Sequence, residues 1–372
     1  MTKILFLIHD LGVGGAEKVL VNLVNHMDRT KFDITVISLF GGGVNEQYLA
    51  GHIRYRAVWK QTVPGNSKLM KLLTPEQLHR LCVKERYDIE VAYLEGAAAR
   101  VVSGCTDPET KLLCWIHVEQ HTRALAAIAF RSYAESQRCY ARFHRIVCVS
   151  ETVKEDFLSI YPEIANASVC YNTIETDKIL AMKEEAVEGL CFRDDEWKLA
   201  AVGKIMPNKG FDRLARVLKR LRDDGLPVHL YALGAGPEQA AIEAYLKENG
   251  LEEAFSFLGY QTNPYKYVAK CDLFVCASLY EGFSTAATEA LIVGTPVCTV
   301  EVSGMKEMLG ARNEWGIVTE NTEDALYAGI KSLLTDPPLL AQYRKRAEER
   351  GKSFSTENTV RDAERLIMSD RQ

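Results

Sequence analysis

Short apolar runs alternate along the chain with stretches whose apolar residues recur at helical spacing. The runs lie at residues 4–8, 33–38, 88–92, 111–116 and 145–149, and then at residues 199–203, 228–233, 273–276 and 296–300. Each run is short and almost continuously apolar, which is typical of a strand buried on both faces. The helical stretches between the runs include residues 211–222 and 238–248. Strands that alternate with helices in this way predict an α/β fold with doubly wound parallel sheets.

The alternation lapses between Ile174 and Trp197, where the sequence becomes charged and helix-prone. A chain of 372 residues also suggests two domains, on a prior of ~150 residues for each. We therefore predict two Rossmann-like domains, the first over residues 1–178 and the second over residues 190–355.

Composition narrows the class of protein. Hydrophobic residues make up 47% of the chain, enough for two cores, and the net charge of −5 argues against a general nucleic-acid binder. The ten cysteines lack zinc-type pairs, and several lie in strand-like runs, which fits a reducing cytoplasm. The first apolar run is too short for a signal peptide, and no segment reaches ~18 apolar residues. We expect a soluble protein, or one bound peripherally to a membrane.

Two segments of the first half are locally basic. Residues 52–86 contain eight Lys or Arg against two acids, namely Arg54, Arg56, Lys60, Lys68, Lys71, Arg80, Lys84 and Arg86. Residues 123–145 contain five arginines against Glu135, with Ile128 and Phe130 among them. Such segments suit the anionic inner face of a membrane or a phosphorylated acceptor. The alternative is an ordinary solvated face.

A glycine-rich turn follows the first predicted strand and includes Gly14 and Gly15. Such a turn lets a ligand approach the backbone amides. It is not a dinucleotide fingerprint, because Glu17 stands where the third glycine is needed. His117 comes at the end of another predicted strand. For the turn the alternative is tight packing of helix on sheet, and for the histidine it is a hydrogen-bonded structural role.

The second half contains three turns at the ends of predicted strands. The first carries Lys204 and Lys209 and opens a helix, so it offers ammonium groups, amides and a helix dipole to a diphosphate. The second contains Gly234, and the third contains Glu281. Since the carboxyl ends of parallel strands share one edge of a sheet, the three turns together favour an anionic, nucleotide-like ligand. Taken alone, the lysines would simply be exposed side chains.

Glu281 and Glu289 lie eight residues apart, which corresponds to roughly 12 Å along a helix. The carboxyl groups of a glycoside hydrolase stand ~5 Å apart in retaining enzymes and ~6.5–9.5 Å apart in inverting ones. An acid/base pair is therefore disfavoured. Two carboxylates could instead accept hydrogen bonds from two diols joined by a diphosphate. The alternative is one solvated loop glutamate and one satisfied helix glutamate.

With these motifs the sequence resembles the retaining glycosyltransferases of the GT-B fold, in the large glycosyltransferase family four that includes many polysaccharide enzymes. The resemblance covers nearly the whole chain. Its most specific element is the E-x7-E motif from Glu281 to Glu289, followed by Gly294-Thr295-Pro296-Val297. The supporting elements are the segments at residues 203–210, 234–237, 257–259 and 14–17.

The resemblance implies two Rossmann-like domains that face a central cleft, the first binding the acceptor and the second the nucleotide sugar. The last helix, at about residues 356–372, would pack back onto the first domain. The implied activity is transfer of a hexosyl or N-acetylhexosaminyl group, with retention, from a nucleoside diphosphate sugar to a hydroxyl of a glycan or lipid-linked acceptor. UDP is the commonest nucleotide in the family, and neither a cofactor nor a metal is expected.

The resemblance also assigns roles to residues. Glu289 would bind the ribose and Glu281 the hydroxyls of the transferred sugar, while Lys204 and Lys209 would hold the diphosphate. His117 would face the donor sugar, and the loop at Gly14 and Gly15 would close over the ligands. The further donor-binding positions are Gly282, Phe283, Ser284, Thr285, Gly234 and Leu258.

Three departures from the family pattern stand out. Lys204 replaces the usual arginine, which keeps the charge but loses the planar fork. The turn at Gly234 lacks the acid that is common there, and of the Pro-Asn-Gly-Val-Asp motif only Asn172 carries over. Two other functions share the architecture: a sugar-nucleotide 2-epimerase and a non-catalytic sugar-nucleotide-binding subunit.

Overall fold

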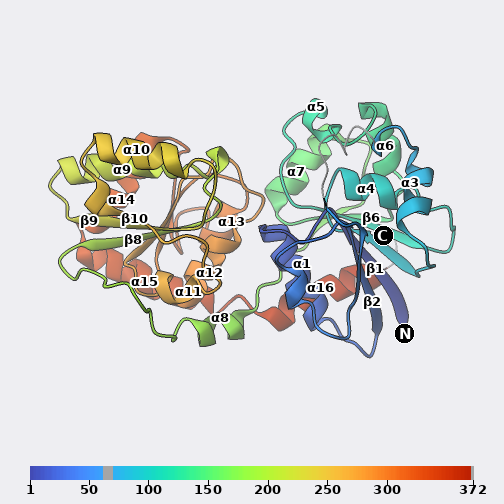
Figure 1. Cartoon of the computed structure of the whole chain (residues 1–372), viewed down its shortest axis with the longest axis horizontal. Coiled ribbons are helices and arrows are strands. Elements are labelled where there is room, and N and C mark those ends of the chain that lie inside the picture. The colour runs from blue at the N-terminus through green and yellow to red at the C-terminus, as the bar shows by residue number, and fades with distance from the viewer. Residues whose placement is uncertain (62–69, 370–372) are drawn as a thin grey trace. The chain divides into compact units, whose positions relative to one another are not determined.

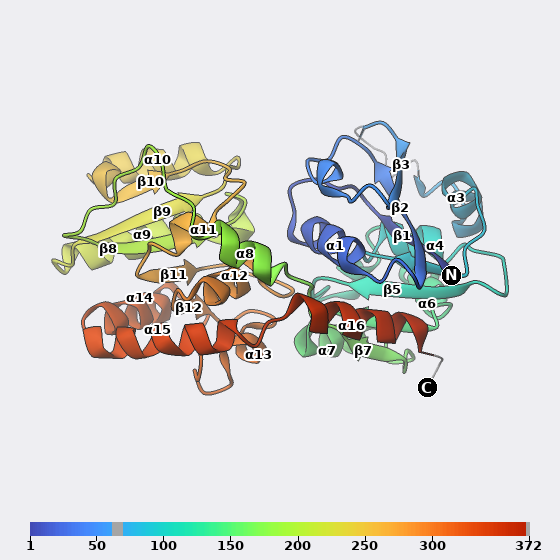
Figure 2. The same cartoon turned by 90° about the horizontal axis from the view of Figure 1, so that it is seen from below.

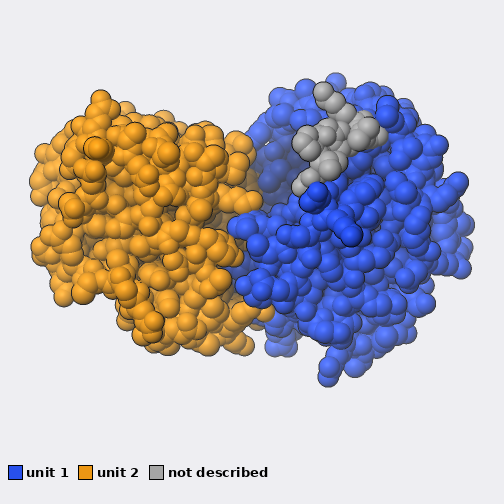
Figure 3. All heavy atoms as spheres, viewed as in Figure 1, with its two compact units in different colours: residues 1–174, 356–372 blue, residues 175–355 orange. Residues whose placement is uncertain are grey.

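The computed structural model describes residues 1–61 and 70–369 (Figure 1). The chain divides into two compact units (Figure 3). Unit 1 comprises residues 1–174 together with the carboxyl-terminal segment from Thr356, and unit 2 comprises residues 175–355. Each unit contains one sheet in which every pair of neighbouring strands is parallel. The doubly wound α/β class predicted from the sequence is confirmed.

Unit 1 is built on a seven-stranded sheet of order β3-β2-β1-β4-β5-β6-β7. Its strands are β1 (Thr2–Ile8), β2 (Phe32–Phe40), β3 (Arg54–Trp59), β4 (Ile89–Ala92), β5 (Lys111–Ile116), β6 (Arg145–Cys148) and β7 (Ala167–Val169). Its α-helices are α1 (Gly15–His26), α3 (Pro75–Cys82), α4 (Ala97–Val102), α5 (Arg123–Ala126), α6 (Tyr133–Tyr140), α7 (Glu151–Ile160) and α16 (Thr356–Met368), and a 3₁₀ turn spans Glu46–Tyr48. Helices α1 and α16 cover one face of the sheet, and α4 and α6 cover the other (Figures 1 and 2).

Unit 2 is built on a six-stranded sheet of order β10-β9-β8-β11-β12-β13. Its strands are β8 (Trp197–Val202), β9 (Val228–Leu233), β10 (Phe255–Phe257), β11 (Leu273–Cys276), β12 (Val297–Val300) and β13 (Ile317–Thr319). Its α-helices are α8 (Thr176–Met182), α9 (Phe211–Asp223), α10 (Gln239–Glu248), α11 (Tyr265–Val268), α12 (Thr285–Val293), α13 (Met305–Leu309), α14 (Glu323–Leu334) and α15 (Pro337–Gly351), with 3₁₀ turns at Pro207–Lys209 and Glu252–Ala254. Helices α9, α10 and α14 cover one face, and α11, α12 and α15 cover the other (Figure 1).

The central strands are almost entirely apolar because helices cover both faces of each sheet. All five residues from Ile4 to Ile8 in β1 are completely buried, and β9 and β12 are buried along their whole length. Several helices begin at side chains that accept a hydrogen bond from the first turn, as Ser150 does from Val153 N at 3.1 Å. Thr74 and Gln77 form a reciprocal capping box at the start of α3.

The sequence missed four strands, β3, β7, β10 and β13, and each is the edge strand of its sheet in the described part of the chain. Three of them are only three residues long. The fourth, β3, contains Arg54 and Arg56, and the sequence indicates only a basic segment there. An edge strand is partly solvated and tolerates charge, so the continuous apolar pattern used to find the strands is absent there.

The boundary between the units lies at Ile174, four residues before the predicted end of the first domain. Residues 175–178 belong to unit 2 because they begin α8, which packs against α11 and α12. At the other crossing the chain returns to unit 1, where Glu364 of α16 accepts a hydrogen bond from Asp28 N at 2.6 Å. Among the described helices none is both long and apolar enough to cross a membrane.

Candidate functional site

Three loops meet at the carboxyl ends of β8, β9 and β11, which are adjacent in the sheet of unit 2. They are the lysine turn (residues 203–210), the glycine turn (residues 234–237) and the glutamate loop (residues 277–284). Backbone hydrogen bonds join them: Ile205 N donates to Ala235 O at 3.1 Å, and Leu279 N donates to Asn208 O at 2.8 Å. The predicted convergence of the three turns on one edge is therefore present within this unit.

Two glycines allow this close packing of the loops. A Cβ atom on Gly234 would lie 1.8 Å from Gly203 O, and one on Gly210 would lie 2.2 Å from Ala277 O. Both glycines also have positive φ angles. Gly234, which was expected to bind the donor, therefore has a sufficient structural reason to be glycine in the contact between two turns.

The glutamate loop and the lysine turn are joined by an ion pair between Lys209 Nζ and Glu281 Oε1, at 2.6 Å. Ser278 Oγ donates to the same carboxylate oxygen at 2.8 Å. Within the described residues the other oxygen, Oε2, accepts no hydrogen bond. Lys204 is exposed, and its ammonium group has no acceptor or acidic partner in the described part of the chain. The two lysines thus differ: Lys209 is held by a carboxylate, and Lys204 is available to an anion.

Helix α12 begins inside the E-x7-E motif. Ser284 caps the helix, since its Oγ accepts from Ala287 N at 3.4 Å, and Thr285 is the first helical residue. Glu281 therefore precedes the helix, so the eight residues between the two glutamates are not all helical, as the estimate of roughly 12 Å from the sequence assumes. The two glutamates have separate surroundings, because Glu289 lies within α12 and is buried.

Glu289 accepts a hydrogen bond on Oε1 from the Tyr265 hydroxyl, at 3.3 Å. Tyr265 opens the short helix α11, and sequence reasoning missed it because a four-residue helix leaves no periodic pattern. Ser278 was also missed as a partner, although it stands three residues before Glu281 in the same loop. This hydrogen bond orients the carboxylate of Glu289, which is buried within the unit.

The remaining predicted positions of unit 2 surround these side chains. Gly282 and Phe283 lie against Gly304, where a Cβ atom would come within 2.7 Å of Phe283 Cδ2. Gly304 has a positive φ angle and was not singled out in the sequence. Leu258 follows β10, and its N–H donates to Ala232 O at 2.9 Å, which brings it to the end of the neighbouring strand β9.

In unit 1, His117 follows β5 and is 6% exposed. Burial lowers the pKa of its imidazole to about 3, so the ring is neutral at physiological pH. The backbone N–H of His117 donates to Glu95 Oε2 at 2.9 Å, and the Tyr93 ring lies 4.9 Å from the imidazole. Nε2 is buried and has no hydrogen-bond partner among the described residues. A buried, unpaired ring nitrogen costs free energy unless another group binds it.

Gly14 and Gly15 lie at the start of α1, where Gly14 is the N-cap and provides no side-chain cap. A Cβ atom on Gly14 would lie 2.0 Å from Glu17 Oε2, so the glycine leaves room for that carboxylate. The preceding turn is fixed by Asp10, which accepts from Gly12 N at 2.7 Å. Gly14, Gly15 and His117 thus occupy the carboxyl-end loops of β1 and β5 in unit 1.

Two groups of three side chains could hold a metal ion in the described part of the chain. They are His79, Glu90 and Cys105, and Glu119, His121 and Asp156. In the first group, the His79–Glu90 ion pair at 2.8 Å already satisfies both members. In the second, Asp156 accepts hydrogen bonds from Gln120 N and His121 N. Neither group includes a residue of the three loops in unit 2.

Comparison with known families accounts for most of the chain. Residues 13–178 match the model described as Glycosyltransferase Family 4, and residues 182–350 match the model described as Glycosyl transferases group 1. A relative from Campylobacter jejuni, N-acetylgalactosamine-N,N'-diacetylbacillosaminyl-diphospho-undecaprenol 4-alpha-N-acetylgalactosaminyltransferase, is 28% identical over 99% of this chain and 100% of its own length. The lipopolysaccharide core biosynthesis glycosyltransferase LpsD of Rhizobium meliloti is 22% identical over 94% of this chain and 93% of its own.

Among solved structures, Anabaena Alr3699/HepE in complex with UDP and glucose superposes with a TM-score of 0.78 and 19% identity, covering 99% of this chain and 100% of that one. This likeness shows the fold. Together with the two family models, it confirms the resemblance to glycosyltransferases of the GT-B fold. The chain belongs to the glycosyltransferases of the GT-B fold, with an amino-terminal part of family four and a carboxyl-terminal part of group one.

Proposed function

We propose that this glycosyltransferase transfers a hexosyl or N-acetylhexosaminyl group from a UDP-sugar to a hydroxyl of a glycan or lipid-linked saccharide, with retention of configuration, in surface polysaccharide biosynthesis. The observation that carries the proposal is the Lys209–Glu281 pair, which stands between the lysine turn and the amino end of α12. The names of three similar proteins support the finer parts of this proposal. The name of the Campylobacter enzyme supports a lipid-linked acceptor, and that of LpsD supports a role in making a surface glycan. The Anabaena complex supports a UDP donor.

The diphosphate would lie over the amino end of α12. The first amides of that helix carry a partial positive charge, and Lys204 and Lys209 add two ammonium groups. These groups stabilise the negative charge that develops on the departing nucleoside diphosphate as the glycosidic bond breaks. In this proposal neither a metal nor a cofactor is needed for that step.

Glu281 would hold the transferred sugar. Lys209 and Ser278 both bind Oε1, so Oε2 is the oxygen that can accept a hydrogen bond from a sugar hydroxyl. Lys209 then has two tasks, because it fixes the carboxylate and adds positive charge near the diphosphate. Glu289, oriented by Tyr265, would accept hydrogen bonds from the ribose diol.

His117 would contribute as a neutral imidazole, with Nε2 either donating to or accepting from a sugar hydroxyl. Its low pKa argues against a role as a protonated general acid. The acceptor hydroxyl attacks on the face from which the diphosphate leaves, and the diphosphate takes the proton. That choice of face follows from the family resemblance.

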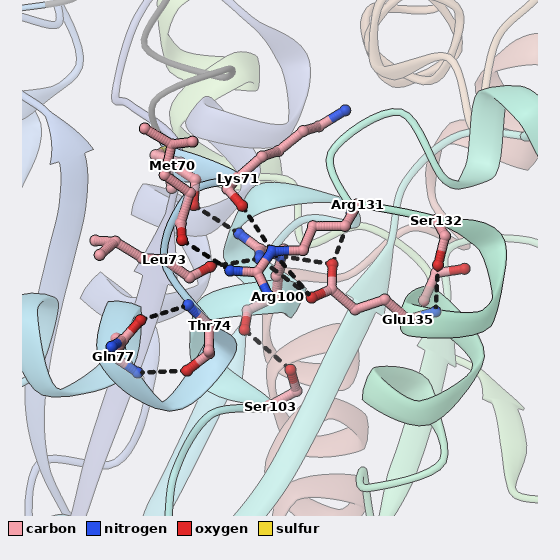
Figure 4. A network of polar contacts seen from close by, with 12 residues as sticks. Met70, Lys71, Leu73, Thr74, Gln77, Arg100, Ser103, Arg131, Ser132 and Glu135 are labelled. Carbon is pink, nitrogen blue, oxygen red and sulfur yellow. Dashed lines mark hydrogen bonds and ion pairs between the residues drawn. The ribbon is translucent and has the colours of Figure 1, made fainter.

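We also propose peripheral contact of unit 1 with the inner face of a membrane. The two basic segments lie side by side, because Arg131 donates to the carbonyls of Lys71 and Leu72 at 2.6 and 2.8 Å (Figure 4). Leu72 is 74% exposed and Ile128 is 68% exposed, so apolar side chains stand beside exposed cationic ones. Such a mixture suits an anionic lipid surface.

Several charges of the basic segments are engaged inside the protein. Arg54 pairs with Asp33 at 3.1 Å, and Arg86 pairs with Asp107 at 2.6 Å. Lys68 lies outside the described residues. The charge available to a lipid surface is therefore smaller than the sequence count suggests, and we place the protein in the cytoplasm with reversible membrane contact.

The test is a thermal-shift panel of nucleoside diphosphates and sugar nucleotides, followed by a donor-hydrolysis and transfer assay. A ligand at 100 times its dissociation constant stabilises the folded state by ~2.7 kcal/mol. Lys209→Ala should lose nucleoside diphosphate release, while Lys219→Ala should keep it, because Lys219 forms an exposed ion pair with Asp223 on α9, away from the three loops.

The outcomes separate the alternatives. No thermal shift with any nucleotide would exclude a sugar-nucleotide enzyme. Conversion of the donor sugar without an acceptor would identify an epimerase. Nucleotide binding without turnover would identify a binding subunit. Equal diphosphate release by wild type and Lys209→Ala would show that the site is misplaced.

A further inference from the structure

Arg213 is a buried arginine in the first turn of α9, directly behind the glutamate loop. Its side chain is 7% exposed. Nη1 donates to Ala277 O at 2.9 Å and to Asn321 Oδ1 at 2.7 Å. Ala277 is the first residue after β11, where the backbone leaves the sheet and its carbonyl loses the ladder partner that a strand residue has. Arg213 supplies that missing donor.

Asn321 continues the same set of contacts on the other side. It follows β13, next to α14, and α9 and α14 pack side by side (Figure 1). Its side-chain amide lies within hydrogen-bond distance of three carbonyls: Ser278 O at 3.3 Å, Leu279 O at 3.4 Å and Glu301 O at 3.3 Å. One side chain therefore links the start of the glutamate loop to the segment that follows β12.

These contacts surround the backbone that carries the proposed sugar ligand. Ser278, whose carbonyl faces Asn321, donates through its hydroxyl to Glu281. Leu279, whose carbonyl also faces Asn321, donates through its N–H to Asn208 of the lysine turn. A shift of residues 277–279 would therefore move the hydroxyl that orients the Glu281 carboxylate and would loosen the contact with the turn that carries Lys209.

Arg213 differs from the neighbouring arginines on α9 in the groups that its guanidinium contacts. Arg216 and Arg220, on the following turns, pair with Glu323 and Asp324 at 2.6 Å each and are partly exposed. Within the described residues no carboxylate lies within ion-pair distance of Arg213, and its acceptors are a backbone carbonyl and an amide oxygen. Both hydrogen bonds come from Nη1, which the planar guanidinium holds in a fixed position, whereas a lysine would place its ammonium group on a flexible stem.

We propose that Arg213 and Asn321 are positioning residues, which fix the glutamate loop so that Glu281 is presented to the donor sugar. This inference rests on the proposed function of Glu281 as the sugar ligand. It predicts that changes in either residue act through Glu281 rather than through the nucleotide-binding end of the site at Glu289.

The test uses Asn321→Asp and Arg213→Lys in the full chain, with Arg216→Lys as the matched control on the same helix. Asn321→Asp keeps the acceptor that faces Arg213 but replaces the amide donor that faces the three carbonyls. For both variants we expect kcat for sugar transfer to fall about 10-fold or more, while the Kd for UDP stays within about 2-fold of wild type. Arg216→Lys should leave both constants unchanged.

A double-mutant cycle with Glu281→Gln tests whether the effect passes through Glu281. Adding Asn321→Asp to Glu281→Gln should lower kcat by less than about 2-fold, because the carboxylate that it positions has already been lost. Multiplicative losses in the double variant would overturn the inference, as would kinetics of Asn321→Asp and Arg213→Lys that match Arg216→Lys. An absence of UDP binding and transfer in the wild-type protein would instead contradict the proposed function, so the two failures are distinguishable.

If Arg213→Lys does not fold, Asn321→Asp still decides the question, since Asn321 is exposed at the surface of unit 2. A melting temperature and a UDP Kd close to those of wild type show that the variant is folded. With these two values unchanged, an unchanged kcat rejects the positioning role.

Discussion

Lys209 and Glu281 are 72 residues apart in sequence, yet their charged groups meet at 2.6 Å across the ends of two neighbouring strands. The pair is only partly exposed, at 28% and 13% of the two side chains. Each partner therefore loses a charge-assisted hydrogen bond if the other is removed.

Lys209→Met should lower kcat by about 100-fold or more, in the range seen when a donor to a developing negative charge is removed. Steady-state kinetics with the donor identified by the thermal-shift panel measures the effect. Lys219→Met, at an exposed ion pair on α9, is the control and should retain wild-type rates. A kcat for Lys209→Met within a factor of three of wild type would contradict the assignment.

Tyr265→Phe should weaken UDP binding by about 5-fold, because one hydrogen bond that orients Glu289 is lost, at a cost of ~1 kcal/mol. Isothermal titration calorimetry gives the Kd. The control is Tyr267→Phe. Tyr267 lies on the same short helix, is similarly buried, and has no hydrogen-bond partner for its hydroxyl among the described residues. It should bind UDP like wild type, and equal weakening in both variants would refute a specific role for Tyr265.

Gly234→Ala should destabilise unit 2, because the new methyl group would stand 1.8 Å from Gly203 O and the backbone has a positive φ angle. We expect a loss of about 2 kcal/mol or more in the free energy of unfolding, as for other overpacked sites. Gly225→Ala separates the two causes, since Gly225 has a φ angle of +80° but open space around its Cβ position. It should cost about 1 kcal/mol, and urea denaturation followed by circular dichroism compares the two variants.

The neutral imidazole of His117 makes stability depend on pH in a defined direction. Its pKa is about 3 in the folded protein and ~6.5 when unfolded, so between these values the unfolded state binds one more proton. The contribution of the neutral His117 to the free energy of unfolding should therefore be complete above pH ~6.5. It should fall by about 1.4 kcal/mol for each pH unit as the pH drops toward 3. His117→Gln should reduce this slope by one proton, as measured by urea denaturation at several pH values. An unchanged slope would mean that His117 titrates alike in both states.

The interior of the fold could be predicted from the sequence because burial on both faces leaves a continuous apolar run, as in β1 and β9. The edge strands could not, since residues such as Arg54 and Arg56 in β3 resemble a solvated segment until their neighbour in the sheet is known. Sequence spacing also could not locate the start of α12, because the small residues after Glu281 give no sign of where the loop ends and the Ser284 cap begins.

For the candidate site, the residue types and the predicted strand ends were sufficient to predict that the lysine turn and the glutamate loop lie at the same edge of the sheet. Partners across the loops could not be foreseen, because hydrogen bonds from Tyr265 to Glu289 and from Arg213 to Ala277 O join residues that share no sequence pattern. The same holds for the contact between Arg131 and Leu72, which unites two basic segments that the sequence could only count separately.

The two points where the chain crosses between units are tied together. Thr356 Oγ1 donates to Ile174 O at 2.8 Å within unit 1, and Thr176 Oγ1 donates to Phe354 O at 3.4 Å within unit 2. At the level of the gene, unit 2 is an insertion between residues 174 and 356 of unit 1, and the two ends of the insertion lie close together. Neither sheet would therefore be broken if residues 175–355 were exchanged for the corresponding segment of a relative, and a short linker from Ile174 to Thr356 would rejoin the two segments of unit 1.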